Sequence, residues 1–351
     1  MKVGDARAAA NDWVTRYARP RPGFAGAYFT GSTVGVPGEA ELPASSDVDV
    51  VVVTTDDQAP PKPGKLLHDG ALLEITYLPW AELAFPDDVL TSYHLAGGFR
   101  TDAVIDDPTG RLRELHAYVA PRFARRAWVR RRCEDARHRV ETRLAAVDPA
   151  APFHEQVLSW LFPTGVTCHV LLVAALRNPT VRLRYRAARD VLTEYGHPGT
   201  HEDLLALLGC ERLPADRVRQ QLWELAVTFD AAAAAGAALG PARTPFFFSS
   251  DITPGARPIA IDGSQALIES GDHREAVFWI IATFARCHAI LSADAPELHE
   301  ARMPAFRSAV ADLGIASTRD LHERAGEVVH YLPRLWRTAE DVMAANPAIT
   351  G

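Results

Sequence analysis

Two aspartates separated by one residue begin a run of valines, and this feature constrains the fold more than any other. The run extends from Asp47 through Asp49 to Val53. A segment so rich in β-branched residues predicts a strand. Side chains two residues apart on a strand point to the same face, about 6–7 Å apart along it. Asp47 and Asp49 are therefore predicted to lie together at one end of a strand, while the alternate valines face a helix-covered core.

A glycine-serine turn precedes this strand in the chain. Gly31 and Ser32 directly follow a segment with strand character at 27–30, and Ser46 stands immediately before the aspartates. Two carboxylates at this spacing suit a pair of Mg²⁺ ions about 3.5–4 Å apart, as used in displacements at phosphorus. A glycine lets the backbone approach a phosphate group closely, and a serine offers it a hydroxyl and an amide. The residues thus predict metal-dependent chemistry on a phosphate.

Size and charge narrow the class of protein. A chain of 351 residues is long for one core, which favours two domains. The net charge of −7 argues against a protein that coats nucleic acid. We find neither an uninterrupted apolar run of membrane-spanning length nor an apolar signal core at the N-terminus, so no membrane partner is expected. The four cysteines have no metal-binding spacing and suit a reduced, cytoplasmic location.

The pattern of predicted elements changes near residue 120. Before it, a predicted helix at 5–19 is followed by strands at 25–30, 47–54, 71–78 and 102–106. After it, long helices are predicted at 121–147, 153–177, 181–195, 202–208, 215–239, 274–291 and 318–345. We therefore predict an α+β fold in which a small mixed β-sheet domain with flanking helices (1–120) precedes a larger, mostly α-helical domain (121–351). An extended flap or hairpin is expected at 244–263.

The order of these features resembles a known superfamily. A strand, Gly31-Ser32, a loop, Asp47-x-Asp49 on a second strand and Glu74 on a third are similar to the nucleotidyltransferases typified by DNA polymerase β. The resemblance is closest in kind to the aminoglycoside and lincosamide nucleotidyltransferases, and it covers about the first 120 residues. Two departures are a longer stretch between Ser32 and Asp47, and two further candidates for the third acid, Asp69 and Asp106.

The resemblance implies roles for particular residues. Asp47, Asp49 and Glu74 would hold two Mg²⁺ ions in the superfamily's manner, and Glu74 would serve as third ligand or general base. Gly31, Ser32 and Ser46 would bind the triphosphate. The reaction implied is transfer of a nucleoside monophosphate, AMP from ATP, to a hydroxyl of a small molecule such as an aminoglycoside-like antibiotic or other secondary metabolite.

Arginines in the helical part are further candidates for binding the triphosphate. Arg182, Arg186 and Arg189 share one side of the helix predicted at 181–195. Guanidinium groups pair well with phosphate oxygens, so Arg186 and Arg189 are candidate nucleotide-binding residues that would reach the triphosphate from the helical domain. The alternative is an ordinary solvated helix face with local pairing to Asp190.

A second class of function stays open. Nucleotidyltransferase-like domains also occur as non-catalytic partners in toxin–antitoxin pairs and as enzymes that modify protein hydroxyls. The intact carboxylates favour a small-molecule transferase over a binding module. Metal-dependent nucleotide binding would separate an enzyme from a scaffold, and the destination of a transferred label would separate the two enzymes.

Overall fold

The computed structural model describes residues 1–56, 59–60 and 62–351 and has a mixed α+β fold. The chain divides into two compact units. The first comprises Met1–Arg132 and Pro347–Gly351, and the second comprises Cys133–Asn346. The C-terminal residues belong to the first unit because the backbone of Thr350 bonds to Ala124 and Arg126, at 3.0 and 2.8 Å. The observed division after Arg132 therefore falls about twelve residues beyond the boundary predicted near residue 120.

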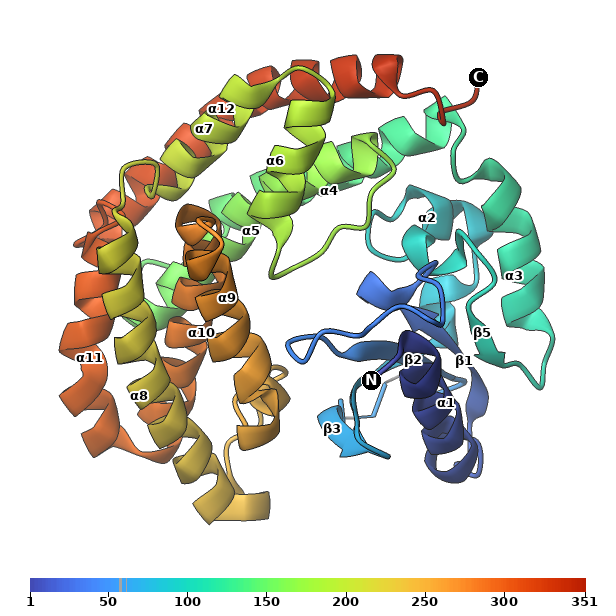
Figure 1. The fold of residues 1–351 in the computed structure, drawn as a ribbon, viewed down its shortest axis with the longest axis horizontal. Helices are drawn as coiled ribbons and strands as arrows, with labels where there is room; N and C mark the ends of the chain where they lie inside the picture. Colours follow the sequence, from blue (N-terminus) through green and yellow to red (C-terminus); the bar gives the residue numbers. More distant parts are fainter. Residues whose placement is uncertain (57–58, 61) are drawn as a thin grey trace. The chain divides into compact units, whose positions relative to one another are not determined.

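The first unit is built on a five-stranded sheet in the order β3-β4-β2-β1-β5. Figure 1 draws this sheet in the blue and cyan part of the chain. Its strands are β1 Phe24–Thr30, β2 Val48–Thr54, β3 Gly64–His68, β4 Ala71–Pro79 and β5 Val104–Asp106. β2 and β4 run parallel, and the other neighbouring pairs are antiparallel. The valine-rich segment thus occupies the centre of the sheet, where both of its faces are covered.

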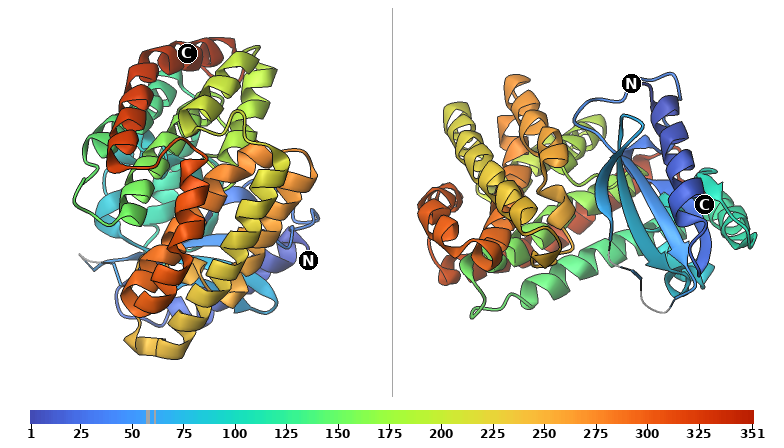
Figure 2. Two further views of the ribbon diagram at one scale, coloured as in Figure 1. Left: turned by 90° about the vertical axis from the view of Figure 1, so that its left-hand side faces the viewer. Right: turned by 90° about the horizontal axis from the view of Figure 1, so that it is seen from below.

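Helices cover both faces of this sheet. On one face, α1 (Val3–Trp13) packs against Val48, Val50 and Val52, as the alternation of valines predicts. The right-hand view of Figure 2 shows α1 lying along one face of the sheet. On the other face, Val51 and Val53 pack with α2 (Pro86–Thr91) and α3 (Arg111–Val119). Asp49 is two residues before Val51 and four before Val53 on β2, so its carboxylate lies on the same face as these valines, opposite α1.

The second unit is helical. Its longer helices are α4 (Arg126–Ala145, which begins in the first unit), α5 (Phe153–Ala174), α6 (Arg184–Glu194), α7 (Pro198–Leu208), α8 (Ala215–Leu239), α9 (Gly263–Glu269), α10 (His273–Asp294), α11 (Pro296–Ala311) and α12 (Thr318–Ala345). α5, α8 and α10 are long and apolar enough to cross a membrane, judged by length and composition alone. The apolar stretches of α5 and α10 are 83% and 89% buried within the structure, as expected of helices at the centre of a bundle.

Several predicted elements need correction. β3 and α11 were not anticipated, and the segment 244–263 contains short helical turns where a hairpin or extended flap was expected. The segment contains two short 3-10 helices, Ser249–Asp251 and Pro254–Ala256. A short π-helix, Pro258–Asp262, continues into α9. The tripeptide Phe246-Phe247-Phe248 lies just before these turns.

Buried histidines make the stability of the helical unit sensitive to acid. Burial, followed by the charge of His299, lowers the pKa of His288 to about 3, and the same causes lower that of His154 to about 4. Between these values and an unfolded pKa of about 6.5, the unfolded chain binds more protons than the folded one. The contribution of these histidines to the free energy of unfolding is therefore fully present above pH 6.5. It is lost as pH decreases, by up to about 1.4 kcal/mol per pH unit for each group.

Urea unfolding between pH 7 and pH 5 measures this slope. The variant His288→Leu removes one of the titrating groups and should give a shallower decline than the unmodified chain. An identical slope in the variant and the unmodified chain would contradict the assignment.

Candidate functional site

Three carboxylates converge at one end of the central strands. Asp47 directly precedes β2, Asp49 lies within it, and Glu74 lies on β4. Asp49 and Glu74 are register partners in the parallel β2–β4 pair, which sets their side chains beside each other on one face. One oxygen from each of the three groups lies within 4.8 Å of the others. The sheet register thus brings together the two aspartates and the glutamate that the sequence singled out.

The two other candidates for the third acid lie elsewhere. Asp69 belongs to a separate group with Asp12 and His68, whose Nε2 lies 2.8 Å from an oxygen of Asp12. Asp106, at the end of β5, forms an ion pair of 3.3 Å with Arg19. Geometry therefore selects Glu74 as the partner of the aspartate pair.

The backbone at Gly31 lies directly against the side chain of Asp49. Its φ angle is +71°, in the left-handed region that favours glycine. A Cβ atom built on residue 31 would lie 1.8 Å from Oδ2 of Asp49, well inside contact distance. Only glycine therefore allows the turn after β1 to approach this carboxylate so closely.

Gly31→Ala is expected to destabilise the fold by about 1–3 kcal/mol and to displace the Asp49 side chain. Gly35→Ala is a matched control, since Gly35 has a φ angle of +79° but no atom within 4 Å of its added Cβ. Chemical unfolding of both variants separates the backbone cost, common to both, from the clash with Asp49. An equal loss of stability in the two would mean that the contact carries no cost.

The remaining predicted phosphate-binding residues lie on the loop between β1 and β2. Ser32 is exposed within a 3-10 turn, Gly31–Thr33, and Ser46 is half-buried beside the aspartates. Arg7 of α1 donates to the carbonyl oxygen of Thr33. Backbone bonds from Val3 to Ala40 and from Gly4 to Gly38, each 2.8 Å, fasten the long part of this loop to the start of α1. The extra residues of the loop are thus hydrogen-bonded through their backbone to the N-terminal segment.

Two lysines accompany the carboxylates, and neither was predicted from the sequence. Lys65, on β3, is the register partner of Glu74 and is 7% exposed. Its Nζ lies 2.5 Å from Oδ2 of Asp47 and also pairs with Glu74, which in turn pairs with Lys62. The signal was present in composition, because lysine occurs only three times in the chain and two of the three are these residues.

Burial and neighbouring charges shift the pKa values of the three acids differently. Burial raises the pKa of Asp47, against the opposing charge of Lys65. Burial also raises the pKa of Asp49 well above its ordinary value, and the negative charges of Asp47 and Glu74 add to this effect. Burial acts in the same direction on Glu74, but Lys65 and Lys62 outweigh it and hold its pKa at about 2. Asp49 is therefore the carboxylate least compensated by protein cations.

This donor set suits a hard divalent cation. Carboxylate oxygens are the ligands that Mg²⁺ prefers, and one oxygen from each of three carboxylates converges here. The raised pKa of Asp49 indicates that a further positive charge beside it would be stabilising. Asp47, Asp49 and Glu74 are the residues that would hold such an ion.

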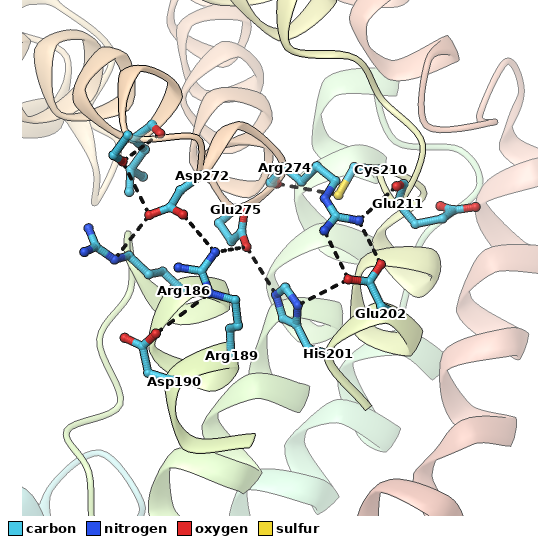
Figure 3. Close-up of polar contacts among 12 residues, drawn as sticks. Arg186, Arg189, Asp190, His201, Glu202, Cys210, Glu211, Asp272, Arg274 and Glu275 are labelled. Atoms are coloured by element: carbon cyan, nitrogen blue, oxygen red, sulfur yellow. Dashed lines mark hydrogen bonds and ion pairs between the residues drawn. The ribbon is translucent and has the colours of Figure 1, made fainter. Parts of the chain in front are cut away.

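Arg186 and Arg189 occupy a polar network in the helical unit (Figure 3). Nη1 of Arg189 lies 2.8 Å from Asp272 and 2.7 Å from Glu275, and Arg186 lies 3.3 Å from the other oxygen of Asp272. Nε2 of His201 lies 3.5 Å from the same oxygen of Glu275. The sequence anticipated pairing with Asp190, which is 3.8 Å from Arg189, but not with the acids of α10 and the residue before it. Their suggested role in nucleotide binding stays a prediction.

His201 also shows that one local prediction was wrong. The helix predicted at 202–208 was expected to begin after His201. In the structure α7 begins at Pro198, where the missing N–H has no helical partner to lose.

The candidate site therefore consists of the Asp47–Asp49–Glu74 cluster, the close turn at Gly31 and the lysine pair, all in the first unit. No family model, no curated protein and no solved structure matches this chain.

Proposed function

We propose that this protein is an Mg²⁺-dependent nucleotidyltransferase that moves a nucleoside monophosphate onto a hydroxyl group of a small molecule. The observation that carries the proposal is the convergence of Asp47, Asp49 and Glu74 on adjacent strands, with Gly31 in contact with Asp49. Such a carboxylate group suits a pair of metal ions that act on a phosphoryl centre. The sequence resemblance to the nucleotidyltransferase superfamily points to the same reaction.

The reaction assigns distinct tasks to the residues of the site. The acceptor oxygen forms a bond to the α-phosphorus, the bond from that phosphorus to the β-phosphate oxygen breaks, and pyrophosphate leaves. The proton of the acceptor hydroxyl passes to a carboxylate of the cluster. Bound Mg²⁺ would neutralise the triphosphate and the departing pyrophosphate. Ser32 and the backbone of the Gly31–Thr33 turn would hold the outer phosphates.

The direct test is pyrophosphate release from each of the four ribonucleoside triphosphates, with and without Mg²⁺, against a panel of hydroxylated small molecules. The panel includes aminoglycosides, lincosamides and neutral or anionic aromatic alcohols. Release that requires metal, nucleotide and one class of acceptor would support the proposal. Nucleotide binding without metal dependence would contradict it.

One observation favours a second candidate, a non-catalytic nucleotidyltransferase-like binding module. Lys65 and Lys62 together supply two positive charges to three carboxylates, which is partial compensation of the kind a metal would otherwise give. In a binding module these lysines would be permanent partners of the acids. In the enzyme, metal ions would compete with Lys65 for Asp47 and Glu74. Calorimetric titration with Mg²⁺ separates the two, because the module would show no heat of metal binding.

A further inference from the structure

A cavity of 460 Å³ lies in the helical unit, and it is independent of the carboxylate cluster. Its walls come from the end of α4, the middle of α5, the phenylalanine tripeptide and α10. A volume of this size is typical of sites for small organic ligands. We propose that this cavity binds a small aromatic molecule that carries a negatively charged group.

The shape of the walls favours a flat, apolar ligand. Leu158, Phe162 and Pro163 of α5 line one part of the cavity, and Phe247 and Phe248 line another. Phe247 is 77% exposed, so its ring offers apolar surface that a ligand can bury. An aromatic ligand would bury this ring and stack against its neighbours.

Arg286 gives the cavity a rigid, flat wall. Its guanidinium carbon lies 5.0 Å from the centre of the Phe162 ring and 5.3 Å from that of Phe248. The side chain is 7% exposed and forms an ion pair of 2.9 Å with Asp251. A guanidinium held in this way offers its planar face to a ring. Because Asp251 offsets its charge, Arg286 serves mainly as a stacking surface.

A second arginine supplies the net positive charge. Arg143, near the end of α4, lines the cavity and is exposed. Among the described residues it has no ion pair, in contrast to Arg286. The cavity is therefore lined by two arginines, of which only Arg286 is paired with an acid, and this charge balance selects an anion such as a carboxylate, a sulfonate or a phosphate.

A helix irregularity adds a hydrogen-bond acceptor to the same wall. Pro163 lies inside α5 and has no N–H, so the carbonyl oxygen of Ser159 lacks the usual bond from the residue four positions later. Ser159 and Pro163 both line the cavity. A ligand with a hydroxyl or N–H group has an acceptor here. A polycationic amino-sugar is disfavoured at this cavity by Arg143.

Fluorescence titration of the full-length protein with 8-anilinonaphthalene-1-sulfonate, an aromatic sulfonate, tests the proposal. One probe per chain is expected. Ala146→Trp, on the cavity wall, should weaken binding at least about tenfold, because the indole would occupy the cavity. Ala145→Trp is the matched control, since Ala145 is exposed but does not line the cavity.

The charge requirement is tested separately. Arg143→Gln should weaken binding of the sulfonate about tenfold and leave binding of the neutral probe N-phenyl-1-naphthylamine unchanged. An excess of kanamycin should not displace the sulfonate. The proposal is overturned by equal probe binding in Ala146→Trp and Ala145→Trp, by equal effects of Arg143→Gln on the two probes, or by displacement with kanamycin. None of these results depends on nucleotide transfer, so failure here leaves the proposed function standing.

Discussion

Asp49→Asn is expected to lower the rate of Mg²⁺-dependent pyrophosphate release by at least about a hundredfold, because a metal ligand supplies several kcal/mol to the transition state. The same change should leave the fold intact or more stable. Burial and the charges of Asp47 and Glu74 already disfavour the ionised form of Asp49. A neutral amide of the same shape removes that penalty.

The measurement combines initial rates with the midpoint of urea unfolding. Asp69→Asn is the matched control. Asp69 was a candidate for the third acid of the cluster, but it lies in the separate group with Asp12 and His68. Its rate should equal that of the unmodified protein. Wild-type turnover in Asp49→Asn, or an equal loss in Asp69→Asn, would remove the carboxylate cluster from the proposed mechanism.

The second large effect concerns the network of Figure 3. Arg189→Leu is expected to reduce the free energy of unfolding by about 3–5 kcal/mol, because it leaves buried carboxylates without their nearest cation. Glu275 is 3% exposed and Asp272 is 11% exposed, so solvent compensates little. Adding Glu275→Gln to the variant should restore part of the loss, since one of the uncompensated charges is then absent.

Arg186→Leu provides the comparison within the same helix. Arg186 is 46% exposed and has one contact of 3.3 Å with Asp272, so a loss of about 0–1 kcal/mol is expected. Urea unfolding of the single and double variants measures both values. Similar small losses for Arg186→Leu and Arg189→Leu would show that Arg189 is not a structural cation of the helical unit.

The sequence supported the central part of the fold because its signals are local. Alternating valines after Asp47 and Asp49 predict a strand with covered faces, and the structure has Asp47 just before the central β2 and Asp49 within it. Long apolar periodicity likewise predicted α8 and α12 with the bounds that the structure shows. Such patterns require no knowledge of distant contacts.

The remaining features depend on contacts that a sequence does not display. β3 is five residues long, follows a proline-rich segment and is defined by its pairing with β4, so Lys65 was overlooked as a partner of Glu74. α11 contains Pro304 in its interior, a residue that usually indicates a helix end. The choice among three candidate acids required the β2–β4 register, which pairs Asp49 with Glu74.

The partners of Arg189 illustrate the same limit at longer range. Asp272 and Glu275 are more than eighty residues away in the chain, and only the packing of α6 beside α10 brings them to the guanidinium. A helical spacing of arginines predicts a shared face, but it does not reveal whether that face meets solvent, phosphate or acid.

The most direct test of the central claim is a Mn²⁺ titration followed by electron paramagnetic resonance, in the presence of a non-hydrolysable ATP analogue. The unmodified protein is expected to bind Mn²⁺ tightly at the cluster of Asp47, Asp49 and Glu74, with up to two ions per chain. The double variant Asp47→Asn/Asp49→Asn should lose this binding. Absence of tightly bound Mn²⁺ in the unmodified protein, or equal binding in the double variant, would contradict the assignment of a catalytic metal site.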